Sequence, residues 1–363
     1  MTDIQIEQLH VPDALEGEAA ADFLSAVEVS RQVRVGTWGN DDLAYTGEEL
    51  LALCHDPFEW YVMLVARLDG GIVGRAGIAM PLDENTELAH VTLDVLPATE
   101  GRGVGRRLLE AAETFVRGEN RRVVVVETNH SASELQAQLS GGDAAQLLHP
   151  AEGGGALPLE NRQARFAYNA GYVLERVEQF SSCRLPFPVD RAAELKRSAD
   201  AAHGEEYVVH QWTDTCPEKW AADVARLEQA VAPQAGEAAW DVARLREAEE
   251  LSQSTGRHTL VTAAESRASG RLVGYTSISV LGKRDDVVFQ DDTIMEDGHR
   301  GRELGLRMKL ANLELLARGY PKSHAIYTWN SAEDTQLINI NSRMGFVAAG
   351  VTGQWRKSFD VDA

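Results

Sequence analysis

Two short glycine-rich stretches decide the fold of this chain: "GRGVGRRLL" at Gly101–Leu109 and "GRELGLRMK" at Gly301–Lys309. In both, glycines and basic residues come just before a run of residues with the apolar spacing of a helix. The first glycines of the two stretches differ by 200 positions, and so do Gly105 and Gly305. The shared register predicts that the chain contains two copies of one unit.

The segments that precede the two loops support a duplication. Tyr61–Met80 holds two apolar runs around an Asp-Gly-Gly turn, and Thr259–Leu281 holds two such runs around a Ser-Gly turn. Both patterns predict a β-hairpin. Gly74 and Gly274, in the second run of each hairpin, again differ by 200 positions. The tandem repeat therefore includes the hairpins as well as the loops.

Each half is expected to continue in the same order, with a strand, the glycine loop, a helix, another strand and a final helix. The strands before and after the loops are predicted at His90–Pro97, Phe289–Met295, Arg122–Thr128 and His324–Trp329. The first half is 26 positions longer between its loop and its last matched glycine. We place this insert at about 130–158 and expect a surface loop or weak helix there, because it is rich in Gly, Ser, Ala and Gln.

These patterns give a domain division. We predict an N-terminal domain at 1–190, a linker at 191–205 and a C-terminal domain at 206–363. The linker region opens with Pro-Phe-Pro and continues with a charged, helix-like stretch, which suits a connection between domains.

Composition excludes several classes of function. The 363 residues carry a formal net charge of -21, which argues against binding to nucleic acids or anionic membranes and mildly favours a cationic or amine substrate. No apolar run is long enough for a membrane span, and the acidic N-terminus lacks the apolar core of a signal peptide. Three widely spaced cysteines form neither a disulfide framework nor a metal-binding pattern. We therefore expect a cytoplasmic protein without a metal, either a monomer or a homodimer.

The loops have the features of a phosphate-binding site. Glycines let a ligand approach the backbone closely, and the first turn of the following helix directs free N–H groups at that ligand. The basic residues around the second loop give it a local positive charge. The pattern lacks the Gly-Lys-Ser/Thr of a nucleotide P-loop and the spacing of a dinucleotide fingerprint. A phosphate or pyrophosphate of another kind is the expected ligand.

The sequence "LPATEGRGVGRRLL", its helix and the endings "GY" and "GF" resemble the Gcn5-related N-acetyltransferase (GNAT) superfamily. Two copies in one chain resemble the tandem GNAT proteins of actinobacteria, such as those of the mycothiol synthase type. The second half, with "HRGRELGLRMKLANL", "TWN" and "INSRMGF", is interpreted as the closer match. The resemblance implies an α/β fold of two GNAT domains. Each would have a mixed, mostly antiparallel central sheet flanked by helices, with a V-shaped cleft for acetyl-CoA as cosubstrate.

The resemblance also implies cofactor-binding residues in both halves. In the second half they are Thr293, Ile294, Met295, Arg300, Gly301, Arg302, Glu303, Leu304, Gly305 and Asn330. In the first half they are Leu93, Val95, Gly101, Arg102, Gly103, Val104 and Gly105. Two residues depart from the family pattern. Glu100 stands where the family has Arg or Gln and would repel a pyrophosphate, and Glu303 stands where the family prefers Gly, which implies an outward side chain.

An acetyl transfer to an amine needs a base, because an alkylamine is protonated near neutral pH. Of the adjacent Asp291 and Asp292, strand alternation lets one at most face the acceptor, and we favour Asp292. Neither half has the tyrosine that the family often uses as acid, since Ala167 and Asn341 stand there. Asn341 and Tyr327 are the other residues we place at the catalytic centre. His90, Thr92 and Asp94 share a strand face in the first half and are interpreted as an exposed polar face rather than a second base site.

We therefore predict an acetyl-CoA-dependent N-acetyltransferase that acts directly on a primary amine of a small molecule in a ternary complex. The C-terminal half is expected to be catalytic and the N-terminal half to be a degenerate copy. Two alternatives stay open: acetylation of an intermediate in a thiol pathway, as in mycothiol synthase, and a non-catalytic regulator that binds acyl-CoA. The aromatic residues Trp212, Trp220, Trp240 and Trp355 could line a cleft, but we interpret each as buried or half-buried core.

Overall fold

Two antiparallel hairpins form the centre of the fold, as the sequence predicts. In the computed structural model, β2 (Glu59–Leu68) pairs with β3 (Gly71–Pro81), and β10 (Arg257–Ser266) pairs with β11 (Arg271–Leu281). The register of both hairpins shifts next to the matched glycines Gly74 and Gly274. A Cβ at Gly274 would lie 2.6 Å from the carbonyl oxygen of Ile294, so no side chain fits there. The structure describes residues 4–17, 20–140, 146–231, 240–282 and 284–359.

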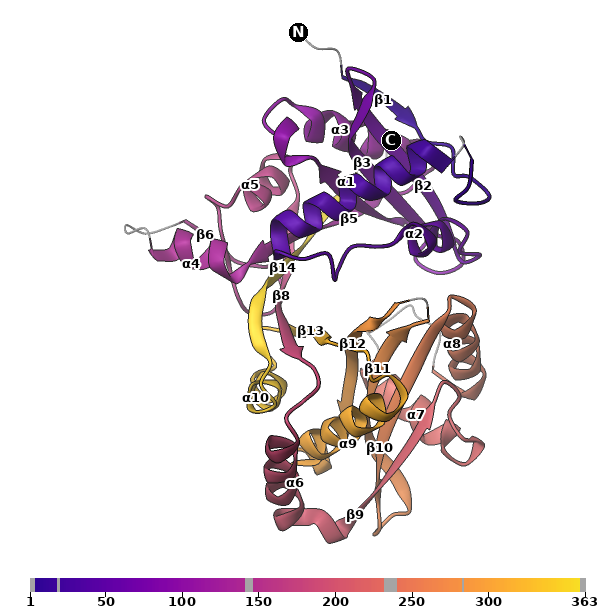
Figure 1. The fold of residues 1–363 in the computed structure, drawn as a ribbon, viewed down its shortest axis with the longest axis vertical. Helices are drawn as coiled ribbons and strands as arrows, with labels where there is room; N and C mark the ends of the chain where they lie inside the picture. The colour runs from indigo at the N-terminus through magenta and orange to yellow at the C-terminus, as the bar shows by residue number, and fades with distance from the viewer. Residues whose placement is uncertain (1–3, 18–19, 141–145, 232–239, 283, 360–363) are drawn as a thin grey trace. The chain divides into compact units, whose positions relative to one another are not determined.

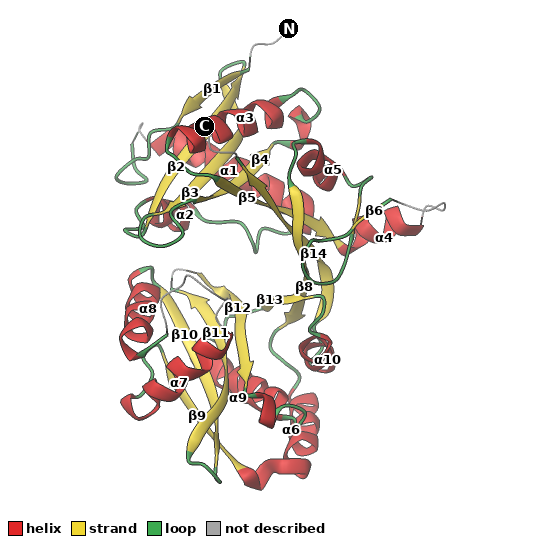
Figure 2. Cartoon of the chain, turned by 180° about the vertical axis from the view of Figure 1, so that it is seen from behind, coloured by secondary structure: helices red, strands yellow, loops and turns green. Residues whose placement is uncertain are grey.

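The contacts divide the chain into two units. The first unit comprises Met1–Gln179, Ser331–Glu333 and Ala349–Ala363, and the second comprises Phe180–Asn330 and Asp334–Ala348. Each unit has its own run of strands and its own covering helices (Figures 1 and 2).

In the first unit, helices cover both faces of a mostly antiparallel sheet. Its strands follow the order β1 (Gln5–Gln8), β2, β3, β4 (Leu88–Val95), β5 (Val123–Ser131) and β14 (Val347–Ser358). The helices α1 (Ala21–Trp38) and α2 (Gly47–Cys54) bury apolar residues against Met63 and Val65 on one face. The other face packs against α3 (Val104–Gly118) and α5 (Arg162–Asn169). Figure 1 shows α1 crossing the strands of this sheet.

The second unit repeats this arrangement. Its strands follow the order β13 (Ala325–Ser331), β12 (Arg284–Met295), β11, β10 and β9 (Tyr207–Thr213). One face packs against α7 (Glu218–Val231) and α8 (Val242–Ser254), and the other against α9 (Leu304–Gly319) and α6 (Val189–His203). The final helix is α10 (Thr335–Arg343). The predicted fold class is confirmed in both units.

One pair of strands in each unit is parallel and short. The pairing of β4 with β5 runs from Leu88 to Val91, and that of β12 with β13 runs from Val287 to Phe289. Beyond these points, β4 and β12 continue, but no further pairing to β5 or β13 is found among the described residues. The backbones of Leu93–Val95 and Thr293–Met295 therefore face an opening between strands, as a V-shaped cleft requires.

The division by contacts differs from the predicted division at both ends of the second unit. The first unit ends at Gln179, within β8 (Val173–Arg184), rather than near 190. Residues from Ala349 onward belong to the first unit, where β14 pairs antiparallel with β5 from Gly350 to Ser358. Sequence patterns locate strands but do not reveal which of two similar sheets a strand joins.

The insert and the linker both contain helices. The insert holds α4 (Ala132–Ser140) and the small strands β6 (Leu147–Leu148) and β7 (Leu157–Pro158), and residues 141–145 of it lie outside the described part. The predicted linker at 191–205 falls mostly within α6, whose Leu195 and Ala199 are buried in the core of the second unit. This segment is therefore a packed helix rather than a free connection.

Candidate active site

The two glycine loops have the same backbone conformation. Gly101 and Gly301 have φ values of +73° and +74°, and the residues just before the helices, Gly103 and Glu303, have φ values of +89° and +60°. Only glycine takes this left-handed region without strain, so Glu303 is held there at some cost in free energy. Its carboxylate lies 2.8 Å from Arg343 on α10, an ion pair that opposes this cost. The Glu303 side chain thus points to a neighbouring helix.

The basic residues of the second loop are less available than their number indicates. Arg300 pairs with Asp297 at 3.2 Å, Arg302 pairs with Glu206 at 2.8 Å, and Arg307 pairs with Asp200 at 3.0 Å. The expected local excess of positive charge is therefore largely compensated. Any pyrophosphate bound here would depend mainly on the free N–H groups at the start of α9.

In the first loop, more of the basic side chains are available to a ligand. Arg102 and Arg106 are exposed and form no ion pair within the part of the chain that the structure describes. Glu100, which we expected to repel a pyrophosphate, forms an ion pair with Arg162 on α5. This pairing weakens the argument from Glu100 against the first loop, and both loops remain able to hold an anion.

The second unit offers buried amides beside the opening of its sheet. Asn330, on β13, accepts a 2.8 Å hydrogen bond from the Nδ2 atom of Asn341 on α10. The Oδ1 atom of Asn341 is buried and has no hydrogen-bond partner among the described residues. A buried acceptor without a partner is costly unless a ligand or water satisfies it. These residues therefore fit an amide-containing arm such as that of acetyl-CoA.

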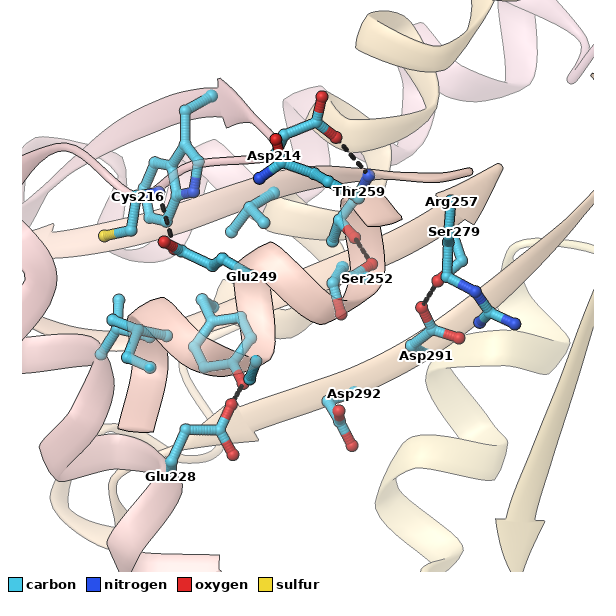
Figure 3. A pocket seen from close by; sticks show the side chains of 18 of the residues that line it. Asp214, Cys216, Glu228, Glu249, Ser252, Arg257, Thr259, Ser279, Asp291 and Asp292 are labelled. Atoms are coloured by element: carbon cyan, nitrogen blue, oxygen red, sulfur yellow. Dashed lines mark hydrogen bonds between the residues drawn. The ribbon is translucent and has the colours of Figure 1, made fainter. Parts of the chain in front are cut away.

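The second unit also contains a pocket of about 550 Å³ on the face covered by α7 and α8 (Figure 3). Acidic and aromatic side chains dominate its wall. The carboxylates are Asp214, Glu228, Glu249, Asp291 and Asp292, and the large aromatic rings are Trp212, Trp240, Tyr275 and Trp329. Trp212 and Trp240 are half-buried against the core, as predicted, and also line this pocket, whereas Trp220 and Trp355 are buried.

Both adjacent aspartates line this pocket, although strand alternation alone would place them on opposite faces of the sheet. Thr276 pairs with Thr293, but Ile278 pairs with Gln290, so Asp291 and Asp292 together lie opposite one residue of β11. This is a β-bulge, which interrupts the alternation of side chains between the faces of a sheet. The bulge comes directly before the strand segment expected to hold the cofactor.

Burial raises the pKa values of three carboxyl groups in the pocket. It raises the pKa of Asp291 to about 6, although a hydrogen bond from Ser279 opposes the shift. It also raises the pKa of Asp292, which is open to solvent on one side. Burial and the nearby Asp292 raise the pKa of Glu228, and the hydroxyl of Tyr275 donates a hydrogen bond to Glu228. Carboxylates with raised pKa values are suited to accept protons near neutral pH.

Tyr327 and Asn341 lie away from this pocket. Tyr327, which is 6% exposed, stacks on Phe180 with 5.4 Å between the ring centroids. Neither Tyr327 nor Asn341 contributes to the pocket wall, so Asp292 alone of the three predicted catalytic residues does so.

Sequence reasoning missed Glu228, Glu249, Tyr275 and Trp329 as pocket residues. A signal was present in β11, where Tyr275, Ser277 and Ser279 share one strand face and alternate with Thr276, Ile278 and Val280. A strand face that carries hydroxyl groups is a weak partner for an apolar helix, so it indicates a cavity. Glu228 and Glu249 lie on helices, and no pattern distinguishes them from solvated carboxylates.

The matching region of the first unit is filled. Arg75, at the position matching Tyr275, is 1% exposed and donates to Asp94 at 2.9 Å and to Ser30 at 3.1 Å. Arg34, on α1, also reaches Asp94, at 3.3 Å. Although burial alone would raise the pKa of Asp94, these arginines hold it below its usual range. The predicted exposed face is therefore wrong for Asp94, while His90 and Thr92 are exposed as expected.

Lys309 is a further buried polar group in the second unit. It lies on α9, four residues after Gly305, with 1% of its surface exposed and no hydrogen-bond partner for Nζ among the described residues. Burial lowers its pKa to about 7, although Asp334 opposes the shift. It therefore adds little positive charge to the loop.

Comparison with known proteins defines the class to which this fold and these loops belong. Residues 30–139 match the acetyltransferase (GNAT) family. The match falls in the first half, so our interpretation of the second half as the closer match is not supported. The three alternating glycines of the first loop are closer to the family pattern than a loop that contains Glu303. No curated protein matches the sequence.

Solved structures resemble the whole chain. The tandem GNAT protein from the clavulanic acid biosynthesis pathway is 21% identical, with a TM-score of 0.72, and the match covers 99% of this chain and 100% of that one. A GCN5-related N-acetyltransferase from Sphaerobacter thermophilus is 15% identical, with a TM-score of 0.61, and covers 99% and 98% respectively. Residues 30–139 thus carry a GNAT-family acetyltransferase domain, and the chain as a whole has the fold of the tandem GNAT proteins.

No metal-binding group of three or more His, Cys, Asp or Glu residues occurs in the described ranges. None of the helices that could be searched has the length and apolar character needed to cross a bilayer.

Proposed function

We propose that the chain transfers an acetyl group from acetyl-CoA to a primary amine of a small molecule, and that the second unit carries out the transfer. The observation that carries this proposal is the pocket beside β12. Its two aspartates directly precede the strand segment expected to hold the cofactor. The matching place in the first unit is occupied by the Arg75–Asp94 ion pair. The three cysteines are unpaired, which suits action in the reducing cytoplasm.

Asp292 has the role of base in this proposal. The acceptor enters as an ammonium ion and gives a proton to Asp292, directly or through water. Its nitrogen then forms a bond to the acetyl carbon as the carbon–sulfur bond of the thioester breaks. Coenzyme A leaves as a thiolate, and the acceptor nitrogen releases its second proton, through water, to that thiolate. Binding both substrates in one site supplies the proximity that the reaction needs, and backbone N–H groups of Thr293–Met295 are placed to stabilise the thioester oxygen.

A matched pair of substitutions tests which unit is catalytic. Gly105→Asp and Gly305→Asp both place a carboxylate in the first turn of a helix, where it suits the helix dipole but repels a phosphate. At Gly105 the added Cβ would make ordinary contacts, and at Gly305 it would meet the flexible tip of Ile340 at 3.2 Å. We expect Gly305→Asp to lower kcat/KM for acetyl-CoA at least about tenfold, and Gly105→Asp to leave it near the wild-type value.

The assay follows release of the coenzyme A thiol with a panel of amines, and calorimetry counts the acetyl-CoA sites in each variant. Loss of turnover in Gly105→Asp alone would transfer the catalytic role to the first unit. Binding of acetyl-CoA with no turnover on any amine would favour the non-catalytic regulator.

A further inference from the structure

The pocket in the second unit contains more negative charge than a single amine would neutralise. Of its five carboxylates, Glu249 is paired with Arg246 at 2.7 Å and Asp214 lies 3.0 Å from His258. Glu228, Asp291 and Asp292 form no ion pair with any described residue. Among the described residues of the pocket wall, Arg257 is the one basic residue, and its charge acts on Asp291.

The three unpaired carboxylates come from two different elements. Glu228 lies on α7, and Asp291 and Asp292 lie at the bulge in β12. Tyr275 donates a hydrogen bond to Glu228, and Ser279 donates one to Asp291 (the latter labelled in Figure 3). Both are neutral donors that orient a carboxylate without cancelling its charge. When all three are ionised, Arg257 leaves an excess of two negative charges.

The walls of the pocket complement this charge. The rings of Trp212, Trp240, Tyr275 and Trp329 supply apolar surface and π faces, which attract both methylene chains and cations. A lone ammonium would leave part of the pocket's negative charge without a partner. Partly buried charges of one sign raise each other's energy until a counter-charge reaches them.

We infer that the acceptor of the second unit is a small molecule with at least two positively charged nitrogens, such as a diamine or a larger polyamine. One nitrogen lies at Asp292, beside the cofactor strand, and is acetylated. The other is held by Glu228 and, when ionised, Asp291. This inference rests on the proposed function for the choice of the reacting nitrogen, but the binding of a dication does not depend on catalysis.

The test compares diaminobutane with aminobutane and aminobutanol, which have the same chain length and a single charged nitrogen. We expect kcat/KM for the diamine to exceed that for either monoamine at least about tenfold at low salt. Glu228→Gln keeps an acceptor for Tyr275 but removes the charge, and should reduce this preference about fivefold or more. Asp291→Asn is the second variant if Glu228→Gln is unstable.

Glu28→Gln is the matched control, because Glu28 is the residue 200 positions before Glu228 and pairs with Arg31 on the surface of α1. It should leave the preference for the diamine unchanged. Equal kcat/KM values for the diamine and the monoamines in the wild type would overturn the inference, as would a preference that both Glu228→Gln and Asp291→Asn leave intact.

Calorimetry with diaminobutane in the absence of acetyl-CoA separates this inference from the proposed function. Tight diamine binding that depends on Glu228, without acetyl transfer to any amine, supports the dicationic ligand and removes the proposed reaction. Acetyl transfer to monoamines, with no higher kcat/KM for the diamine, supports the proposed reaction and overturns the dicationic ligand.

Discussion

The two units have the same hairpins, the same loop conformation and the same register. One region of the fold, however, is filled with side chains in the first unit and forms a pocket in the second. In the first unit, Arg75 and Asp94 form a buried ion pair where the second unit has Tyr275 and Ile294. The hydroxyl of Tyr61 lies 2.1 Å from the place of a Cβ at Gly77, where the second unit has Ser277. A fold can thus keep its cofactor loop and lose room for an acceptor through a few side chains.

The two units also differ in the strand beside this region, which is β4 in the first unit and β12 in the second. The pairing of β3 with β4 is regular from Gly74 to Ala79, whereas the pairing of β11 with β12 contains the bulge at Asp291 and Asp292. One extra residue in β12 therefore provides two carboxylates where the first unit has Thr92 alone. The halves thus differ in this pocket region as well as in the ion pairs of their glycine loops, whose backbone conformation is shared.

The largest expected effect concerns the ion pair that fills the first unit. Asp94→Asn should lower the free energy of unfolding of this unit by about 3–5 kcal/mol, because it leaves the buried Arg75 without its counter-charge. Chemical denaturation followed by tryptophan fluorescence measures this change. The double variant Arg75→Met with Asp94→Leu should recover most of the loss, since it removes both charges. A single variant as stable as the wild type would show that the pair does not hold this region.

The next effect concerns the base in the second unit. Asp292→Asn should lower kcat by about 100-fold or more, the usual contribution of a positioned base. In the wild type, kcat/KM should rise with pH as Asp292 ionises, and its raised pKa shifts this rise above the range of an ordinary aspartate. The variant should lose that limb of the pH profile. Thr92→Ala in the first unit is the matched control, and an equal loss there would remove the distinction between the units.

The smallest effect concerns Lys309, which matches Leu109 in the first unit. Lys309→Leu should raise the free energy of unfolding by about 1–3 kcal/mol at pH 7, because a buried amine without a partner is replaced by an apolar side chain. The pKa of Lys309 is about 7 when folded and 10.5 ordinarily, so the wild type gains stability as pH rises between these values. The advantage of the variant should therefore shrink toward pH 10.

Thermal and denaturant unfolding of wild type and Lys309→Leu across this pH range would measure the difference. Leu109→Lys offers the reverse exchange and should destabilise the first unit. A less stable Lys309→Leu variant would mean that the ammonium group has a stabilising partner in the folded protein.

The repeated landmarks were sufficient to predict most of the fold. Gly74, Gly101 and Gly105 recur 200 positions later. At Gly74 a side chain would collide with its neighbours, and Gly101 has a positive φ, so both positions favour glycine for a physical reason. The sequence did not predict that β14 pairs with β5, because the sequence of a strand does not indicate which of two similar sheet edges it joins. The site was only partly predictable for a similar reason.

Asp292 was found from its place before the cofactor strand, but the bulge that brings Asp291 to the same pocket depends on the pairing with β11. The charge of the second loop was overestimated because Glu206 and Asp200, which pair with Arg302 and Arg307, lie about 100 positions away in the sequence. Counts of local charge do not include such distant partners.

The place of β14 has a consequence for synthesis of the protein. Thr128 on β5 and Gly353 on β14 are 225 positions apart, yet they lie opposite each other in the first unit. At about 5–20 residues per second, a ribosome needs on the order of ten seconds or more to translate this stretch. During that time the valine-rich β5 lacks the β14 neighbour that it has in the finished fold. The nascent first unit thus has an unpaired strand edge that is prone to aggregation. Chaperones would have to cover this edge until β14 has been synthesised.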